Sequence, residues 1–318
     1  MSQPDTGNGE TSLTTSLRPM GFTDILDSIF NLYRHHCRLF VCICAVYFVF
    51  NFGFNLIMGF LPFMLRGAGG LSVTITILVI GILITLVATL FTVGGLIFAS
   101  GQSYLGRHVT ASTAFRHVKR RFWHILGGIL LLVLVVGAPF LTIAVCVIAI
   151  PIIGAVGVVI GVFVMAICLI PVAIYIGTRW IFWSLAVLIE EHSTINALRR
   201  SSELVKGSWW RVFGIILGIL LLVLIIQSIL QFSLLFVFGV TQSTGGDEDL
   251  LTTLQRMFLP ELTTWAGVVT YAVQNFINHL VASLMLPIGA IGTTLLYFDQ
   301  RIRKEGFDIE MRVTDTAA

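Results

Sequence analysis

Charged residues are scarce in this chain: of its 318 residues, 11% are Asp, Glu, Lys or Arg, and 57% are hydrophobic. A soluble domain has about 25% charged residues, since its core must be covered by a surface that water solvates. So low a charge content excludes an ordinary soluble protein and predicts an integral membrane protein. We therefore expect membrane lipids as partners and no nucleic acid.

A disulfide framework and a signal peptide are also missing. The chain has five cysteines, an odd number, and most of them lie within apolar runs, which is not the pattern of a disulfide-stapled domain. The first sixteen residues, MSQPDTGNGETSLTTS, are polar and lack the basic region and apolar core of a signal peptide. We predict a disordered tail over 1–16, a membrane domain over 17–311 and a C-terminal tail over 312–318.

Short catalytic and metal-binding motifs are absent as well. The sequence has no Walker A loop, no HExxH and no GxSxG, so we predict no catalytic residue, no cofactor and no enzymatic activity. His35 and His36 lie near Cys37, Cys42 and Cys44. Adjacent histidines diverge by about 100° on a helix, and the cysteines lie in or beside an apolar run, so we predict no metal site.

Six apolar runs are long enough to cross a membrane, which requires about 20 mostly apolar residues. They lie at 39–64, 71–100, 125–150, 152–178, 212–240 and 266–297. The apolar region from 125 to 189 is too long for one crossing, which favours two spans with a turn near Pro151; one broken segment is the alternative. The fold class predicted is an all-α integral membrane protein with six transmembrane helices.

The basic residues indicate the orientation. With the N-terminus inside, the inner segments hold all but two of the 19 Lys and Arg residues, and the outer loops keep only Arg66 and Arg256. An excess of Lys and Arg in short loops marks the cytoplasmic side. We predict that both termini are cytoplasmic.

Three segments share one pattern: a Ser or Thr near the start, an amphipathic stretch, basic residues, an aromatic residue and then a span. They are GFTDILDSIFNLYRHHCRLFVCICAV, TASTAFRHVKRRFWHILGGILLLVLVV and HSTINALRRSSELVKGSWWRVFGIILGILLLVLII. We expect three helical hairpins, each preceded by an interfacial amphipathic helix whose apolar face lies in the acyl boundary. Thr23, Ser112 and either Ser193 or Thr194 are the expected N-caps.

The segments LRPMGFTDILDSIFNLYRHH, NALRRSSELVKGSWWRVFGIIL and LLYFDQRIRKEGFDIEM together resemble the membrane domain named for glycerophosphoryl diester phosphodiesterases. That family of polytopic bacterial and archaeal membrane proteins is mostly of unknown function, and the resemblance covers about residues 17–311. Some members carry a catalytic barrel, but this chain has no His-Arg-Gly motif for one. The resemblance implies a bacterial or archaeal cell membrane and a polytopic fold, not phosphodiesterase activity.

Basic and tryptophan residues at the inner ends of the spans are the first group of candidate site residues. Contact with lipid headgroups and the positive-inside bias explain them most simply; a specific site for an anionic lipid or phosphate is the alternative. The group consists of Arg120, Arg121, Trp123, Arg199, Arg200, Lys206, Trp209, Trp210 and Arg211.

Polar residues inside the spans form the second group. Because such residues are costly in lipid, they usually face the interior of a helix bundle. They either join helices by hydrogen bonds or line a polar path, as in transporters with broken helices. The group consists of Asn51, Asn55, Gln227, Gln231, Gln274, Asn275, Asn278 and His279.

The third group is a C-terminal clamp made by Asp299, Arg301 and Arg303. Asp299 and Arg303 are four residues apart on a helix, so they pair side by side, and Gly306 follows as a stop. A structural clamp is favoured over a catalytic carboxylate, because no second acid or metal ligand accompanies Asp299 at a recognised spacing.

Three functions remain open from the sequence. The first is a non-catalytic protein that contacts lipids or serves as a scaffold for a membrane protein partner or a second copy of the chain. The second is a transporter or lipid-translocating protein that uses the polar residues of the spans. The third, an intramembrane enzyme acting on headgroups, is the least favoured.

Overall fold

The computed structural model describes residues 20–64, 70–148, 167, 169–242 and 265–306. These residues are helical, with no strand among them. The predicted tails at 1–16 and 312–318, the turn near Pro151 and most of the span predicted at 152–178 lie outside the described residues.

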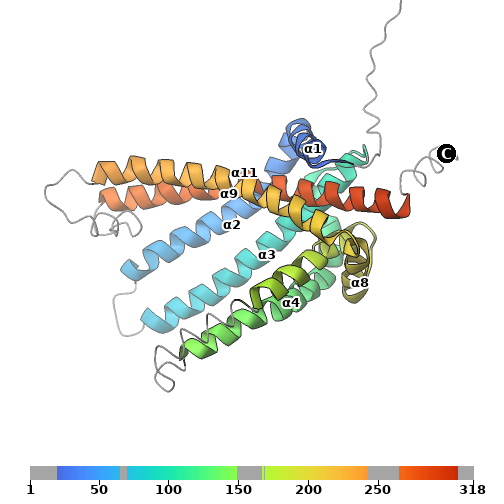
Figure 1. The fold of residues 1–318 in the computed structure, drawn as a ribbon. Coiled ribbons are helices and arrows are strands. Elements are labelled where there is room, and N and C mark those ends of the chain that lie inside the picture. The colour runs from blue at the N-terminus through green and yellow to red at the C-terminus, as the bar shows by residue number, and fades with distance from the viewer. Residues whose placement is uncertain (1–19, 65–69, 149–166, 168, 243–264, 307–318) are drawn as a thin grey trace, which may run out of the picture.

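Eight helices with bounds make up most of the described residues, together with a further helical stretch at 169–179, and Figure 1 shows their arrangement. They are α1 (Phe22–His35), α2 (Cys37–Met64), α3 (Gly70–Tyr104), α4 (Ala111–Ile148), α7 (Trp183–Leu188), α8 (Thr194–Val205), α9 (Trp209–Gln242) and α11 (Trp265–Glu305).

Five described helical stretches are long and apolar enough to cross a membrane. They are Cys37–Leu61, Ser72–Tyr104, Leu169–Leu188, Trp209–Leu234 and Gly267–Glu305. The chain is therefore a multi-pass helical membrane protein by the length and composition of its helices. The side chains at 138–148, in the second half of α4, lie outside the described residues. The number of five spans therefore refers to the described residues only.

Helix α11 lies at the centre of the molecule, in contact with α1, α2, α3, α8 and α9. Its 41 residues span about 60 Å at 1.5 Å per residue, roughly twice the hydrocarbon thickness of a bilayer. The end of α11 therefore extends past the apolar layer, and Figure 1 shows it running beyond α9 and beneath α1. The predicted stop is confirmed: α11 ends at Glu305, and Gly306 has φ +63°.

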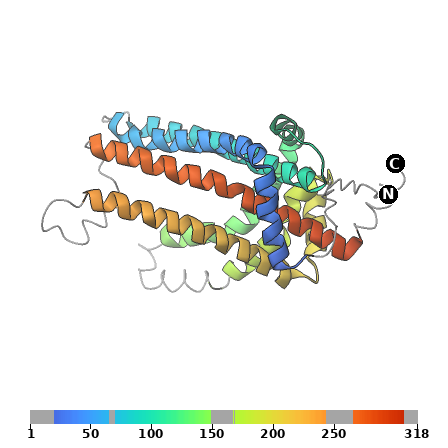
Figure 2. The same ribbon diagram turned by 90° about the horizontal axis from the view of Figure 1, so that it is seen from above.

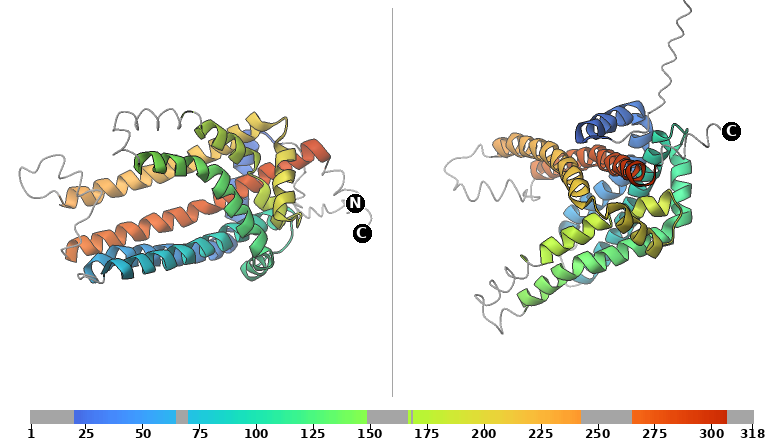
Figure 3. Two further views of the ribbon diagram at one scale, coloured as in Figure 1. Left: turned by 90° about the horizontal axis from the view of Figure 1, so that it is seen from below. Right: turned by 45° about the vertical axis from the view of Figure 1, so that its right-hand side comes forward.

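The buried core is concentrated at one end, which we call the cap. The cap comprises α1, α7, α8, the first turns of α2, α4 and α9, the last turns of α3 and α11 and the loops next to them, gathered at the same end of the long helices (Figures 2 and 3). Phe40, Phe182, Leu204 and Tyr297 are fully or almost fully buried there. Away from the cap, the long helices expose large apolar side chains, as lipid-facing helices do.

The apolar faces of two predicted interfacial helices are covered by protein rather than by lipid. Ile25 and Ile29 of α1 are completely buried, and α1 packs against α11. Leu204 and Val205 of α8 are buried, and α8 packs against α7 and α11. Protein and lipid demand the same period of 3.6 residues from an apolar face, so the sequence pattern alone does not distinguish these two environments.

The second predicted interfacial helix is not a separate helix. Residues 111–148 form one continuous helix, α4, whereas His36 separates α1 from α2 and residues 206–208 separate α8 from α9. Because no glycine or proline interrupts α4 before Gly127, nothing in the sequence ends its amphipathic part.

Of the expected N-caps, only Ser193 is confirmed, at the start of α8. Gly21 precedes α1 instead of Thr23, because the neighbouring Met20 is held by Asp299 and Gly21 N donates to Asp24 Oδ2 at 2.9 Å. Helix α4 begins at Ala111, ahead of Ser112, and the hydroxyl of the preceding Thr110 accepts a hydrogen bond from Thr113 N.

Candidate functional site

Asp299 is the centre of the first polar network in the cap, and its side chain is 0% exposed. Arg211 donates to Asp299 Oδ2 at 2.6 Å, and Arg303 Nε lies 3.1 Å from Oδ1. Met20 N donates to Oδ1 at 2.8 Å, and both arginines donate to Met20 O. The predicted Asp299–Arg303 pair is confirmed. The structure adds that the clamp ties the starts of α1 and α9 to the end of α11.

Glu190 is the centre of the second network. It accepts hydrogen bonds from Arg200 Nε at 2.9 Å and from the hydroxyl of Tyr297 at 2.5 Å. Arg301 lies 3.4 Å from the same carboxylate, and both arginines also pair with Glu305. Arg301 therefore belongs to the Glu190 network and not to the Asp299 clamp in which it was expected.

The electrostatics of the second network follow from its geometry. Burial alone would raise the pKa of Glu190, but the hydrogen bonds from Arg200 and Tyr297 and the charges of Arg200 and Arg301 outweigh it and lower that pKa. The hydrogen bonds that Arg200 donates to Glu190 and Glu305 raise the pKa of its guanidinium. The carboxylates and guanidinium groups of the network thus stay charged at neutral pH.

Helix α4 is joined to the loop after α7 by separate contacts. Arg121 forms an ion pair with Glu191 and also donates to the Glu191 carbonyl. His117 Nε2 lies 2.9 Å from the Leu188 carbonyl oxygen. Of the residues predicted to contact headgroups, Arg121, Arg200 and Arg211 therefore hold partners within the cap.

Other members of the first candidate group face outward. The exposed fractions of Trp123 and Trp210 are 76% and 79%. Arg120 is exposed, as are its neighbours Arg116 and Lys119, and none of these three cations has an ion-pair partner among the described residues. We call the set Arg116, Lys119, Arg120, Trp123 and Trp210 the exposed rim.

The remaining members of this group fall between the residues that are paired within the cap and those that face outward. Arg199, 82% exposed, pairs with Glu203, and the Lys206 side chain is exposed. Trp209 stacks on Phe213 with a centroid distance of 5.1 Å, and its Nε1 donates to the Tyr175 carbonyl. The adjacent tryptophans thus separate into Trp209, which packs on neighbours, and Trp210, which faces outward.

The polar residues in the spans are brought together in two places. Between α2 and α11, Asn55 Nδ2 lies 3.1 Å from His279 Nε2, and the Tyr271 hydroxyl donates to the Asn55 carbonyl. Asn51 and Asn275 instead donate to carbonyls of their own helices. This first group therefore joins two helices.

The second place lies between α9 and α11. Gln227, Gln231 and Asn278 line a cavity of about 180 Å³ with four apolar residues. Gln274 is half-buried on α11 and lies outside both groups. The group between α2 and α11 thus fits an interhelical contact. The group between α9 and α11 fits a polar path.

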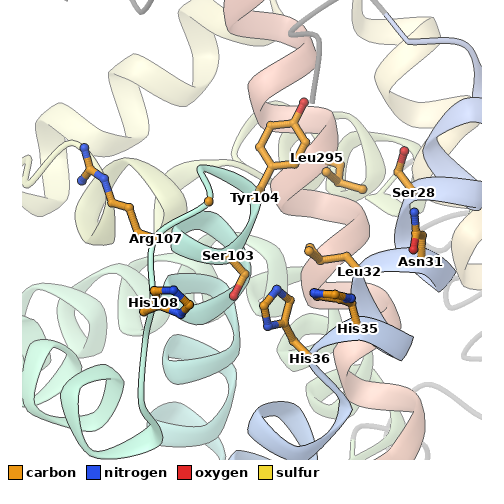
Figure 4. A pocket seen from close by; sticks show the side chains of 11 residues that line it. Ser28, Asn31, Leu32, His35, His36, Ser103, Tyr104, Arg107, His108 and Leu295 are labelled. Carbon is orange, nitrogen blue, oxygen red and sulfur yellow. The ribbon is translucent and has the colours of Figure 1, made fainter. Parts of the chain in front are cut away.

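The sequence did not point to a polar cavity in the cap, which holds about 280 Å³ and is lined by His35, His36 and His108 (Figure 4). The sequence did contain a signal for this cavity: His35–His36 precedes the first span and Arg107–His108 follows the second. Because consecutive spans are antiparallel, both pairs lie at the same membrane surface. Among the described residues, no group of three His, Cys, Asp or Glu side chains is placed to hold a metal ion.

The described residues thus define a multi-pass helical membrane protein whose helices are tied together at one end by the ion pairs of Asp299 and Glu190. Comparison with family models, with curated proteins and with solved structures gives no match. The resemblance to the phosphodiesterase-associated membrane domain therefore stays a prediction.

Proposed function

We propose that this protein is a non-catalytic membrane module that contacts anionic lipid headgroups through the exposed rim. The observation that carries the proposal is the separation of its basic residues. Arg200 pairs with the half-buried Glu190 and Arg211 with the buried Asp299, whereas Arg116, Lys119 and Arg120 are exposed beside Trp123. Exposed tryptophan and unpaired cations at the start of a long apolar helix are typical of a headgroup contact.

The architecture that belongs to this proposal has six crossings arranged as three hairpins, with both termini cytoplasmic in a bacterial or archaeal cell membrane. In it, α4 crosses the membrane after residue 125 and returns through the helix that ends at 179. The exposed rim then lies at the cytoplasmic leaflet, as the bias of Lys and Arg favours. A membrane protein partner or a second copy of the chain would bind the lipid-facing helices.

The lipid proposal is tested by tryptophan quenching in reconstituted vesicles. Phosphatidylcholine vesicles would contain the same small fraction of brominated phosphatidylglycerol or of brominated phosphatidylcholine. We expect stronger quenching by the anionic lipid, because each cation near an anionic surface contributes about 1 kcal/mol. The preference should fall with salt and be lost in the triple variant Arg116→Gln, Lys119→Gln, Arg120→Gln.

The matched control is Arg199→Gln, which removes an exposed guanidinium that is already paired with Glu203. Its lipid preference should equal that of the wild type. Equal quenching by the two brominated lipids in the wild type at low salt would contradict the proposal.

A second function, translocation of a lipid or other amphiphile, is favoured by one observation. Gln227, Gln231 and Asn278 line an opening between α9 and α11 at membrane depth, where unpaired polar groups are costly unless they serve a cavity or a path. Replacing Gln231 and Asn278 by Leu should abolish exchange of fluorescent lipid between leaflets. Asn51→Leu, which removes a hydrogen bond within α2, should leave exchange unchanged.

A further inference from the structure

The cavity in the cap is built from three separate parts of the chain: residues 28–36, residues 103–108 and Leu295 of α11. Helix α1 contributes Ser28, Asn31 and His35, the α1–α2 junction contributes His36, and Ser103 and His108 come from the end of α3 and the loop after it. Figure 4 shows the His36 ring and the Ser103 hydroxyl facing the same space, with the rings of His35 and His108 beside it. Arg107 lies at the edge of the cavity, and its side chain extends away from it.

The lining is rich in groups that donate hydrogen bonds. It holds three imidazoles, a guanidinium, an amide and the hydroxyls of serine and tyrosine, and no carboxylate is among the lining residues. An imidazolium donates from both ring nitrogens, and a serine hydroxyl donates one hydrogen bond. Charge-assisted donors of this kind are suited to the oxygens of an anion.

The surrounding elements carry other charged or titratable groups. Asp24 accepts a hydrogen bond from Gly21 N, and Asp299 is held by Arg211 and Arg303. The carboxylate nearest in sequence to the lining residues is Asp27, which is exposed on α1. Further such groups on these elements include Tyr33 and Arg34 on α1, Cys37, Arg38, Cys42 and Cys44 on α2, Tyr104 on α3, and Tyr297, Arg301, Lys304 and Glu305 on α11.

The depth of the cavity is set by its neighbours in the chain. The apolar stretch of α2 begins at Cys37, directly after His36, and that of α3 ends at Tyr104, directly after Ser103. The cavity therefore lies at the boundary of the hydrocarbon layer, where lipid phosphates lie. Its volume of about 280 Å³ is at the small end of ligand sites, which hold about 300–1,000 Å³.

We propose that this cavity binds one phosphate-type oxyanion, either the phosphate of a lipid headgroup or free phosphate, between His36, His108 and Ser103. The two imidazolium rings donate to the anion and balance its charge, and Ser103 and Asn31 add neutral donors. The site is distinct from the exposed rim and does not depend on the lipid contacts proposed for it.

The state of the histidines in the empty cavity supports this. Burial and the neighbouring His35 and His108 lower the pKa of His36, so positive charge is disfavoured until an anion arrives. A bound anion reverses the sign of this interaction and raises the pKa of His36. Binding therefore takes up protons, and the affinity should increase as the pH falls from 8 to 6, through the range in which histidine titrates.

Calorimetric titration of the full chain in phosphatidylcholine nanodiscs tests the site. Sulfate is the first probe, since it stays a dianion over this range, and inorganic phosphate is the second. We expect one sulfate per chain, bound at least about tenfold more tightly at pH 6 than at pH 8, because removing or adding one charge-assisted hydrogen bond changes affinity by about that factor.

Three variants make the test specific. The double variant His36→Gln, His108→Gln should lose about a hundredfold in affinity at pH 6, about tenfold for each imidazole. The matched control His124→Gln removes an imidazole of α4 that lies outside the lining of the cavity, and should bind as the wild type does. The triple rim variant should also bind as the wild type does, which separates this site from the proposed function.

The source of the phosphate is decided with nanodiscs that contain a few per cent phosphatidate, a lipid with a phosphomonoester headgroup. A phosphorus resonance of phosphatidate that shifts with wild type but not with the double variant, together with no uptake of inorganic phosphate, identifies a lipid headgroup site. Uptake of inorganic phosphate alone identifies a site for a soluble anion, and competition between the two identifies a shared site. Unchanged affinities in a double variant with a wild-type thermal midpoint, or no binding of any of the three anions to the wild type, overturns the proposal.

Discussion

At the scale of single residues, the cap is organised by two carboxylates, Asp299 and Glu190, each held between two arginines. Both oxygens of Asp299 already accept hydrogen bonds, which leaves little capacity for the proton transfer that a general base performs. A structural role follows for Asp299, because a buried charge without partners would cost several kcal/mol.

The first prediction concerns Asp299→Asn. The amide keeps an acceptor for Met20 N but leaves Arg211 and Arg303 without a carboxylate, so we expect the free energy of unfolding to fall by about 3 kcal/mol. Unfolding in detergent micelles, followed by circular dichroism, measures it. Glu203→Gln, which breaks the exposed pair with Arg199, should cost less than about 0.5 kcal/mol. Equal losses in the two variants would mean that the clamp does not hold the cap together.

The second prediction uses the lowered pKa of Glu190. A carboxylate whose pKa is lower in the folded state stabilises the fold above the unfolded pKa of about 4.5, and the stabilisation is lost as the pH falls through the folded value. Wild type should therefore exceed Glu190→Gln in thermal midpoint at pH 7, and the difference should shrink towards pH 3.5. A difference that stays constant between these pH values would assign the loss to packing instead of charge.

At the scale of helices, the sequence predicted where the helices lie in the chain better than it predicted what surrounds them. The apolar runs at 39–64 and 212–240 correspond to α2 and α9 within a few residues, because a continuous apolar run has one solution in a membrane, the helix. The surroundings of α1 and α8 were not predictable, since an apolar stripe of period 3.6 packs equally well on lipid or on protein.

The long-range partners of the candidate residues could not be predicted from the sequence either. The pair of Asp299 with Arg303 follows from a spacing of four residues, but the pair of Asp299 with Arg211 joins positions 88 residues apart. Glu190 was not singled out at all, because no local pattern marks it. Only the packing of α8 against α11 brings it to Arg200, Tyr297 and Arg301.

The third prediction follows from the packing of α1. Ile29 is 0% exposed and its neighbour Phe30 is 46% exposed. Ile29→Ala should lower the free energy of unfolding by about 2–5 kcal/mol through lost contacts and a cavity, while Phe30→Ala should cost less than about 1 kcal/mol. Micelle unfolding of the two variants measures both. If α1 lay in the acyl boundary with its apolar face to lipid, Ile29→Ala would have no larger effect than Phe30→Ala.

At the scale of the whole molecule, polar contacts and buried side chains are concentrated in the cap, while the long helices extend from it with apolar, exposed surfaces (Figure 1). In a membrane, lipid would be the neighbour of those surfaces, and the ion-pair networks of the described residues lie in the cap. The cap then fixes which helix ends lie on the same side of the membrane, and this makes the number of crossings measurable.

The last prediction decides between five and six crossings. Ser112 and Ser193 are exposed, and the predicted spans 125–150 and 152–178 lie between them. If both cross, the two positions lie on one side. If only the Leu169–Leu188 stretch crosses, they lie on opposite sides.

With the five native cysteines replaced by Ala, single variants Ser112→Cys and Ser193→Cys would be exposed to an impermeant thiol reagent on intact cells. Six crossings with cytoplasmic termini require that both react only after permeabilisation, while Ser243→Cys, in a predicted outer loop, reacts in intact cells. If Ser112→Cys or Ser193→Cys alone were labelled in intact cells, only one of the predicted spans 125–150 and 152–178 would cross the membrane. This result would also place Arg121 and Glu191, which the cap joins, on opposite faces of the membrane. Because an ion pair cannot form across the hydrocarbon layer, that outcome would overturn the six-span topology and the cap together.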